Sequence, residues 1–446
     1  MKSRFILLIS IFLLSWSSAV FSQTSLPDSL TLGQAIHMAL SRNPAVQQAV
    51  HAIEASEAGV QVSKSSLYPN ADVSLNYTFI GPASSFSFPG FGSFQLFPTS
   101  NFDEHVGASA TLYDFGKRKR SIDLARTEVQ SSKDGLALVR QDLAYRTIQT
   151  FYGILFLEKA ITVQNDEIKT LEQHLFITKK KVEAGTSTDF DVLTTQVRVA
   201  AAQDQKISLE NSLANTKIAL RHLLGLPAGS PINVSGQFVE TPLTLNMDSL
   251  VDVALKNRVE MKAADDRILT AQAAYNVASA IYNPTLNVAA AYGFKNGYEP
   301  DINAWRGNYM IGAQVEIPIS SVVPYFGGYR KQNMEQQASS NIQQAQSYKS
   351  EVAQQVSADV QKGISDLRSS TDKLQTTEVA VQQAETALSL ARIRYEAGTV
   401  TNLDLLDAET ALAQVRLERL QALYNYVNGR YELEQAIGEK PLNPKP

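Results

Sequence analysis

The chain has 446 residues, no cysteine and a formal net charge of −4. These values exclude disulfide bonds, thiol chemistry and a cysteine-linked lipid anchor, and the mild acidity argues against nucleic acid as a partner. No nucleophile or nucleotide-binding motif occurs, and the histidines lie far apart without metal-ligand spacing, so we expect no catalytic residue, no metal and no cofactor. The five histidines are His37, His51, His105, His174 and His222.

Residues 1–22 have the layout of a secretory signal peptide. Lys2 and Arg4 precede an apolar run from Phe5 to Trp16, and small residues follow up to the predicted cut after Ser22, with a cut after Ala19 as the alternative. The apolar run has 12 residues, whereas a membrane-spanning helix needs about 20. We therefore predict export from the cytoplasm. No second long apolar run follows, so any membrane crossing must use β-strands.

The remaining chain contains an internal duplication. Two nearly equal shifts align its halves without further gaps, which predicts two copies of one unit at 23–227 and 246–446, joined by a linker at 228–245. A shift of 215 pairs Pro69 with Pro284 and Tyr77 with Tyr292, and a shift of 213 pairs Gly185 with Gly398, Thr186 with Thr399 and Asp191 with Asp404.

The first copy begins with a helix that proline ends and continues into alternating strands. Apolar residues such as Val73, Leu75 and Tyr77 interleave with polar ones such as Asp72 and Ser74. This alternation fits either a soluble sheet over a core or a barrel wall between lipid and water. The predicted elements are a helix at 31–66, strands at 71–80 and 102–113, a helix at 117–183 and a helix at 189–224.

The second copy repeats this order, with an apolar stripe every seven residues along its long helix. Such a narrow stripe buries a seam against neighbouring helices, as in a coiled coil. The equivalent helix at 117–183 would be about 100 Å long. The predicted elements are a helix at 248–281, strands at 285–295 and 307–318, a helix at 329–395 and a helix at 401–437, and the stripe is Val360, Leu367, Leu374, Val381, Leu388 and Tyr395.

The two helix–proline–strand junctions, the paired Ala-Gly-Thr turns and the stretch from Gly398 to Ala408 resemble the TolC-like outer membrane efflux family over essentially the whole mature chain. The resemblance implies a mainly α fold with a small transmembrane β part. Long coiled-coil helices would form a trimeric α-barrel tunnel in the periplasm, topped by a shared 12-stranded β-barrel with four strands per subunit. Four strands alone cannot close a barrel, because the smallest barrels have about eight.

The same resemblance implies a passive exit duct in the outer membrane, acting in a tripartite efflux or type I secretion system. Its implied partners are two further copies, a periplasmic adaptor, an inner-membrane pump and outer-membrane lipid. The alternative is a periplasmic coiled-coil structural or adaptor protein without its own pore. An adaptor would carry one helical hairpin with soluble β-domains, and this chain leaves hardly any sequence for such domains.

The resemblance also assigns site residues near the turns. Asp404 and Asp407 occupy the spacing of the acidic rings at the pore constriction, where carboxylates favour cations. Alternatively, these acids only stabilise a helix N-terminus. Contacts that close the mouth are implied for Tyr395 and Asp191, although Val400 stands where the family has an arginine. Arg392 or Arg394 would substitute for that arginine, and the turn tips for adaptor docking would be Gly185, Thr186, Gly398 and Thr399.

Two segments allow several interpretations. The loop at 81–99 carries five phenylalanines and would form a lid over the exit, an aromatic girdle or a cluster of its own rings. The basic run from Lys117 to Arg120 would face anionic lipid head groups or form a solvated helix start. Cations are unfavourable at a helix N-terminus, which slightly favours a partner outside the helix.

Overall fold

The computed structural model of the chain describes most of both copies. The predicted signal peptide at 1–22 and residues 240–245 of the predicted linker lie outside the described residues. The described residues are 29–82, 85–90, 92–239, 249–319, 323, 325 and 329–439.

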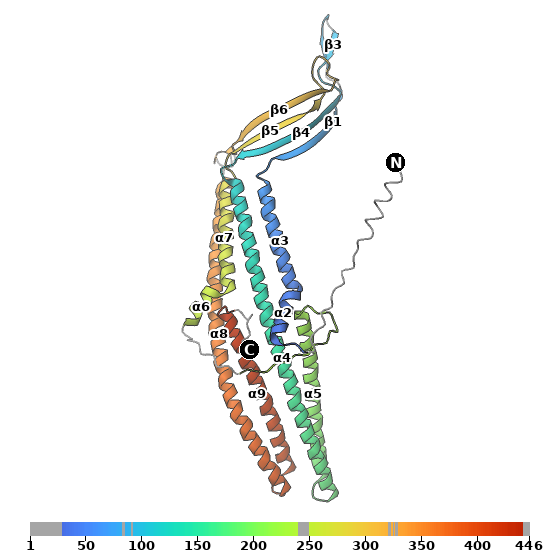
Figure 1. Cartoon of the computed structure of the whole chain (residues 1–446), viewed down its shortest axis with the longest axis vertical. Coiled ribbons are helices and arrows are strands. Elements are labelled where there is room, and N and C mark those ends of the chain that lie inside the picture. The colour runs from blue at the N-terminus through green and yellow to red at the C-terminus, as the bar shows by residue number, and fades with distance from the viewer. Residues whose placement is uncertain are drawn as a thin grey trace, which may run out of the picture.

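The described chain is a rod of helices with a β-sheet at one end (Figure 1). Helices α4 and α8 run from the sheet to the far end, α3 and α7 lie beside their upper parts, and α5 and α9 lie beside their lower parts. The α4 helix has 67 residues, about 100 Å at 1.5 Å per residue. The helices are α2 (Leu32–Arg42), α3 (Pro44–Ser65), α4 (Lys117–Glu183), α5 (Asp189–Leu223), α6 (Leu250–Asn257), α7 (Val259–Ala280), α8 (Tyr329–Glu396) and α9 (Asn402–Ala436).

Strands from both copies form a single antiparallel sheet in the order β1-β4-β5-β6. A short hairpin of β2 and β3 projects beyond it (Figure 1). Among the helices that the structure describes, none has an apolar stretch long enough to cross a membrane. The strands are β1 (Asn70–Phe79), β2 (Ser85–Phe88), β3 (Gly92–Gln95), β4 (Ser100–Tyr113), β5 (Thr285–Lys295) and β6 (Arg306–Glu316).

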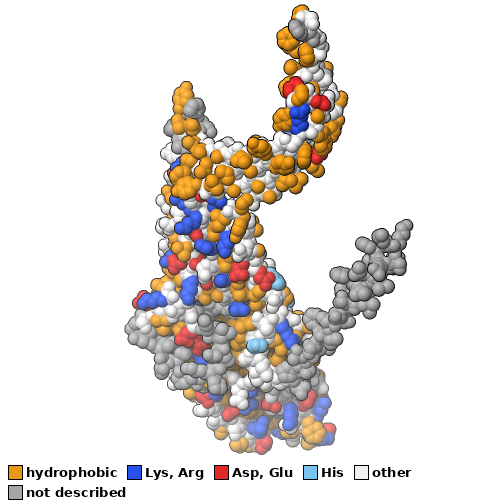
Figure 2. Space-filling model, turned by 45° about the horizontal axis from the view of Figure 1, so that its top comes forward, with side chains coloured by type: hydrophobic (Ala, Val, Ile, Leu, Met, Phe, Trp, Pro, Cys, Tyr) orange, Lys and Arg blue, Asp and Glu red, His pale blue; other side chains and the backbone are white. Residues whose placement is uncertain are grey.

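One face of the sheet is apolar across all four strands. The register aligns Val73, Val106, Tyr292 and Tyr309 in one row, and all four side chains are exposed. Figure 2 shows apolar side chains gathered over the sheet, whereas the helices beneath carry mixed charges. An exposed apolar band of this extent needs a cover from outside the chain. The neighbouring row, on the opposite face, is Ser74, His105, Gly293 and Asn308.

The predicted phenylalanine-rich loop at 81–99 contains regular structure, the β2–β3 hairpin. Phe86 pairs with Phe94 across the hairpin, and its ring lies 4.8 Å from that of Phe88. These three rings share one face because strand side chains alternate, and all three are exposed. Within this chain the rings therefore cluster with each other and leave their outer side uncovered.

The main core lies at mid-height, where the two copies meet. Its largest fully buried side chains include Phe151, Ile148 and Ile154 of α4, and Val360 of α8 and Leu433 of α9 pack in the same cluster. A smaller buried cluster of Leu171, Val199, Ala202 and Leu406 lies lower in the rod. Burial is therefore concentrated in the middle of the rod, and the lower helices are joined by narrower seams.

The predicted continuous helix at 31–66 is wrong at one residue. Asn43 lies between α2 and α3 with φ −65° and ψ 129°, outside the helical region, because Pro44 follows it. The Asn43 side chain accepts a hydrogen bond from the Ala45 amide at 2.8 Å and donates one to the Leu223 carbonyl at 2.9 Å. The break thus ties the first helix of the copy to the end of α5.

The predicted helix at 248–281 is also wrong at one residue, although no proline follows the break. Arg258 lies between α6 and α7 with φ −63° and ψ 136°. Its buried guanidinium binds Glu260 at 2.8 Å and Asp359 of α8 at 2.6 Å. A buried cation needs such partners, and these ion pairs fix the break against α8.

Candidate functional site

Two turns of the same construction lie at the end of the rod far from the sheet. Gly185 and Gly398 both have φ 74°, a left-handed backbone that glycine adopts without steric cost. The next amide, that of Thr186 or Thr399, donates to a carbonyl five residues earlier at 2.8 Å or 2.9 Å. These bonds cap the carbonyl ends of α4 and α8, so both long helices stop at the predicted turn residues.

The following helices also begin in the same way, with a capping box. At the first tip the Thr188 amide donates to Asp191 Oδ2 at 3.0 Å, and the Asp191 amide donates back to Thr188 Oγ1 at 3.2 Å. At the second tip the Thr401 amide donates to Asp404 Oδ2 at 2.7 Å, and the Asp404 amide donates to Thr401 Oγ1 at 3.2 Å. Asp191 and Asp404 thus satisfy backbone amides at the helix starts.

These hydrogen bonds lower the pKa of both capping aspartates. Hydrogen bonds from the Thr401 side chain and amide hold the pKa of Asp404 below its usual value. Burial pushes the pKa of Asp191 upward, but hydrogen bonds from Thr188 and Ser187 outweigh it, and its pKa is also lowered. Both carboxylates therefore favour the ionised form.

The predicted constriction residues Asp404 and Asp407 lie on the first turns of α9, and both are exposed in the single chain. Being three residues apart, they project from one side of the helix. Arg198 of α5 donates from Nη2 to Asp407 Oδ1 at 2.9 Å. This arginine was missed from the sequence, because it lies 209 residues from its partner and no local spacing links them.

The predicted closure residues Tyr395 and Asp191 are not joined through their side chains. The buried Tyr395 hydroxyl donates to Asn402 Oδ1 at 3.4 Å, and Lys181 Nζ lies 3.7 Å from the Tyr395 ring centre. The carboxylate of Asp191 accepts from Thr188, while its backbone carbonyl accepts from Asn402 Nδ2 at 3.4 Å. Asn402 therefore stands between the two predicted residues.

Asn402 is the centre of a buried polar network that the sequence did not reveal. It is 7% exposed, and His174 Nε2 of α4 donates to its Oδ1 at 2.7 Å. Its Nδ2 donates to Thr195 Oγ1 of α5 at 3.3 Å, and Thr178 Oγ1 lies 3.5 Å from its Oδ1. With Tyr395 of α8, one side chain of α9 thus connects all four helices at the lower end.

A cavity of about 220 Å³ lies beside this network, between α4, α8 and α9. Among its lining residues, Glu409 is 5% exposed, and none of the described residues forms a hydrogen bond with its Oε2. Arg392 lines the cavity and Arg394 does not, although both are exposed, and Val400 is half-buried. The lining residues are Thr170, Gln173, His174, Ile177, Lys181, Arg392, Tyr395, Glu396, Leu405 and Glu409.

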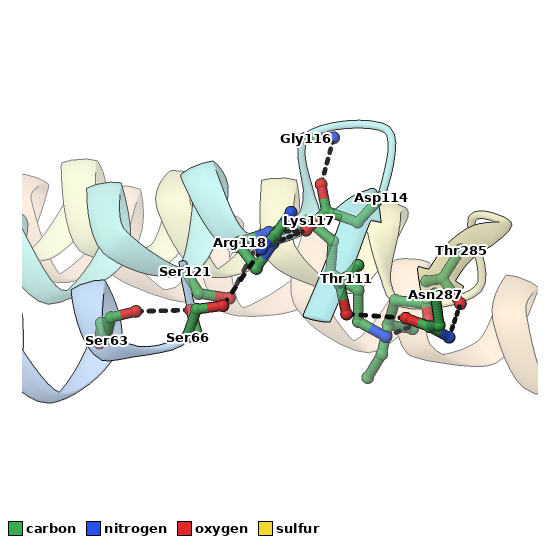
Figure 3. Close-up of polar contacts among 11 residues, drawn as sticks. Ser63, Ser66, Thr111, Asp114, Gly116, Lys117, Arg118, Ser121, Thr285 and Asn287 are labelled. Carbon is green, nitrogen blue, oxygen red and sulfur yellow. Dashed lines mark hydrogen bonds and ion pairs between the residues drawn. The ribbon is translucent and has the colours of Figure 1, made fainter. Parts of the chain in front are cut away.

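The basic run at the start of α4 lies at the strand–helix junction, at the other end of the rod (Figure 3). Arg118 Nε donates to Asp114 Oδ2 at 2.7 Å, and its Nη1 donates to the Ser66 carbonyl at 3.1 Å. Lys117 Nζ donates to the Ile281 carbonyl at 3.0 Å. Ser66 and Ile281 are the C-cap residues directly after α3 and α7, so these cations lie at the negative ends of two neighbouring helices.

Arg120 continues this pattern by donating to the Asn276 carbonyl and the Ser279 hydroxyl of α7, both at 3.2 Å. Three of the four cations in the run therefore bind other parts of this chain, and Lys119 is exposed. The cations at the start of α4 suggested a partner outside this helix, and most of their partners are other residues of the same chain. The run joins α3, α4 and α7 where the strands begin.

Comparison with known families gives one match that covers both copies. The family model described as outer membrane efflux protein matches residues 35–226 and 250–439. The outer membrane protein TolC of Vibrio cholerae is 24% identical over 323 residues, which are 71% of this chain and 72% of that protein. The alkaline protease secretion protein AprF of Pseudomonas aeruginosa is 23% identical over 435 residues, which are 93% of this chain and 86% of that protein.

Solved structures share the fold at low sequence identity. The CmeC outer membrane channel of Campylobacter jejuni matches with a TM-score of 0.79 and 15% identity, covering 91% of this chain and 85% of that chain. CusC matches with a TM-score of 0.76 and 19% identity, covering 94% of this chain and 96% of that chain. The helical rod and its sheet therefore have the fold of outer-membrane channel subunits.

Proposed function

Since the chain belongs to the outer membrane efflux protein family, we propose that it is one channel-tunnel subunit of a tripartite efflux or type I secretion system. It is a passive exit duct for solutes across the periplasm and the outer membrane, and not an enzyme. The family match covers both copies of the unit, and this confirms the family that the sequence resembled. The alternative of a periplasmic coiled-coil or adaptor protein without a pore has no such support.

The observation that carries this proposal is the open sheet with one apolar face. Its edges are β1 and β6, and unpaired strand edges are not tolerated in lipid. If β6 of one copy pairs with β1 of the next, three copies with four strands each close a barrel. The row that contains Val73 and Tyr309 would then face lipid, and the row that contains Ser74 and Asn308 would face water. A homotrimer thus removes both the open edges and the exposed apolar band.

The helices would continue this barrel as a tunnel through the periplasm. The capped turns at Gly185, Thr186, Gly398 and Thr399 form the end farthest from the sheet (Figure 1). We assign to these turns the docking of a periplasmic adaptor. The sequence contains no nucleotide-binding loop, so the energy for transport must come from an inner-membrane pump in the same assembly.

We assign the pore constriction to Asp404 and Asp407. Three subunits would bring six carboxylates to a narrow lumen, where they would favour cations and bind multivalent ones. The structure adds a qualification, because Arg198 pairs with Asp407 and offsets part of its charge. Asp404 also holds the cap of α9, so its two roles must be separated by substitution.

Closure of the mouth is assigned to Asn402 acting between Tyr395 and Asp191. The hydrogen bonds of Asn402 reach α4, α5 and α8, so separating the α8–α9 pair from the α4–α5 pair would break His174–Asn402 and Asn402–Thr195 together. Buried donors and acceptors that lose their partners carry an energetic cost until water reaches them. The contact therefore favours the closed arrangement within each subunit.

The constriction is tested by neutralising the acids while keeping the cap. Asn can still accept the Thr401 hydrogen bonds, so Asp404→Asn with Asp407→Asn should lower cation selectivity and weaken block by trivalent cations in a planar bilayer. The matched control is Asp191→Asn, which alters the capping aspartate of the first tip and should leave selectivity unchanged. Unchanged selectivity in the double variant would show that these residues do not line the constriction.

The function itself is tested by fractionation and by mass. We expect the mature protein in the outer-membrane fraction, extracted by detergent as a trimer that conducts ions. Recovery in the soluble periplasmic fraction without detergent would contradict an outer-membrane duct. A single subunit in detergent that conducts ions by itself would contradict the shared barrel.

A further inference from the structure

Glu409 lies two residues beyond Asp407, on a different side of α9. Its side chain is 5% exposed, whereas that of Asp407 is 59% exposed. Glu409 borders the cavity of about 220 Å³ between α4, α8 and α9, and its Oε2 has no hydrogen-bond partner in the part of the chain that the structure describes. A carboxyl group in such a place is unusual, because burying an unpaired charge is costly.

The surroundings of Glu409 do not neutralise it by an ion pair. Among the described residues, no cation lies within salt-bridge distance of it, and Arg392 of α8 attracts it from farther away. The carboxylate of Glu167 of α4 repels that of Glu409. Glu167 itself accepts a hydrogen bond from Gln164 at 2.6 Å. The charged and titratable groups that face this region are Glu167, His174 and Lys181 of α4, Asp191 and Arg198 of α5, and Arg392, Tyr395 and Glu396 of α8.

The protonation of Glu409 follows from this burial. Burial raises the pKa of Glu409 to about 7, with Arg392 lowering it and Glu167 raising it. Burial also raises the pKa of Glu167 and lowers that of His174. With the helices packed as they are, Glu409 therefore holds its proton to near neutral pH, and burial favours the neutral form of His174.

The duplication provides an internal comparison for this position. The shift of 213 that aligns the two tips places Gln196 of α5 on Glu409 of α9. Gln196 is exposed and carries no charge, whereas Glu409 is buried and carries a carboxyl group. This position of the repeated unit thus carries a titratable side chain only in the second copy, where it lies between the α4–α5 pair and the α8–α9 pair.

We propose that Glu409 is a proton-controlled contact of the periplasmic mouth, neutral while α9 packs against α4 and ionised when the helical pairs separate. This inference rests on the proposed channel function and concerns the regulation of its closed state. The cavity, the unpartnered Oε2 and the neighbouring Asn402 network place the group at the seam that must open. No element of the sheet takes part.

The sign of the effect follows from proton linkage. The closed arrangement binds the proton of Glu409 up to a pH of about 7, and the separated arrangement exposes a carboxyl with the usual pKa of 4.5. Raising the pH between these values therefore favours the separated arrangement by up to tenfold per pH unit, or about 300-fold in total per subunit. Protonation of His174 in acid would act in the opposite direction, because it would place a cation in the same buried region.

The experiment uses the trimeric full-length protein and a reporter on the second tip. Because the chain has no cysteine, a spin label at Leu403→Cys, an exposed position, gives the distances between the three tips by pulsed electron resonance. We expect these distances to lengthen as the pH rises from about 5 to about 8. In Glu409→Gln, which has nearly the same shape and no titration, we expect this dependence to be lost.

The matched control adds a carboxyl at the equivalent exposed position. Gln196→Glu in the otherwise unaltered protein should keep the same pH dependence. Infrared difference spectra should also show a protonated carboxyl band that disappears in Glu409→Gln. The proposal is overturned if the pH dependence persists in Glu409→Gln or if that band is unchanged.

Failure of the proposal is distinguishable from failure of the channel function. A trimer that conducts ions but has pH-independent tip distances would retain the duct and reject the role of Glu409. A protein that forms no conducting trimer would reject the duct itself. At about pH 5 Glu409 is already neutral, so we expect Glu409→Gln to conduct like the unaltered protein at that pH. Equal conductance would show that the variant folds correctly.

Discussion

The tip between α4 and α5 and the tip between α8 and α9 are built from the same local parts. Each ends a long helix with a left-handed glycine and starts the next with a Thr–Asp capping box. The difference lies one residue after the capping threonine, where the first tip has exposed Asp189 and the second has buried Asn402. Local geometry was therefore duplicated, while the contacts behind each tip differ.

This difference assigns the two tips separate roles. The first tip contributes two hydrogen-bond acceptors, the Asp191 carbonyl and the Thr195 hydroxyl. The second tip contributes Asn402 and Glu409, which lie against α4. The same substitution at equivalent positions should therefore change local stability equally when it removes a capping hydrogen bond. It should change local stability unequally when it removes a contact between the two helical pairs.

The largest difference is expected for Asn402→Leu. This change leaves His174 Nε2 without its hydrogen-bond partner and removes one contact from each of the Thr178 and Thr195 hydroxyls, which keep their bonds to backbone carbonyls. We expect a cost of about 2–4 kcal/mol of local stability. Hydrogen exchange of the first turns of α9 should accelerate accordingly. The control, Asp189→Asn in the first tip, should stay within about 0.5 kcal/mol, because its side chain is exposed. Similar effects at both positions would refute the asymmetry of the tips.

The next effect should be the same at both tips. Thr188→Ala and Thr401→Ala each remove one capping box and should each cost about 1 kcal/mol of local helix stability. Hydrogen exchange of the amides at the start of α5 and α9 would measure both. A loss of stability at only one tip would mean that the two caps stabilise their helices unequally, despite their matching hydrogen bonds.

Acid should weaken both caps together. The pKa values of Asp191 and Asp404 lie below the usual value of 3.8, so their stabilisation is complete above that pH and is lost as the pH falls through the lowered values. Exchange at both helix starts, corrected for its intrinsic rate, should rise in the same range. In Asp404→Asn the second tip should lose this response and the first tip should keep it.

The smallest effect on stability is expected for Arg198→Ala. Its side chain and that of Asp407 are 38% and 59% exposed, and exposed pairs contribute about 0–1 kcal/mol. Cation selectivity should nevertheless rise, because Asp407 loses its counter-charge. Arg126→Ala removes an exposed pair with Asp123 on the same helical rod and should leave selectivity unchanged. A fall in selectivity in Arg198→Ala would place Asp407 away from the lumen.

Much of the architecture is encoded in local patterns. The alternation that includes Val73 and Tyr77 predicted an apolar face of the sheet, and the resemblance to the efflux family is confirmed by the family match. The Asn43-Pro44 step already carried the signal for the break between α2 and α3. The shift of 215 places Asn43 on Arg258, so the duplication would have transferred that break to the second copy.

The seam between the tips was harder to predict, because its contacts join residues far apart in the chain. His174 and Asn402 are separated by 228 positions. Asn402 follows Tyr395 by seven residues, but it is polar and lies beyond the turn at Gly398, where the apolar stripe ends. A polar residue directly after a capping threonine is also ordinary at a helix start. Glu409 resembled one more acidic residue on an exposed helix until packing against α4 and α8 showed its burial.

The junction shown in Figure 3 has a mechanical consequence. Lys117 and Arg118 bind the carbonyl groups of the C-cap residues of α7 and α3, so three helix ends and the root of the sheet are tied into one collar. If a partner rotates the periplasmic end, α3, α4 and α7 should move together at this collar. The strands attached to the collar should then rotate with these helices.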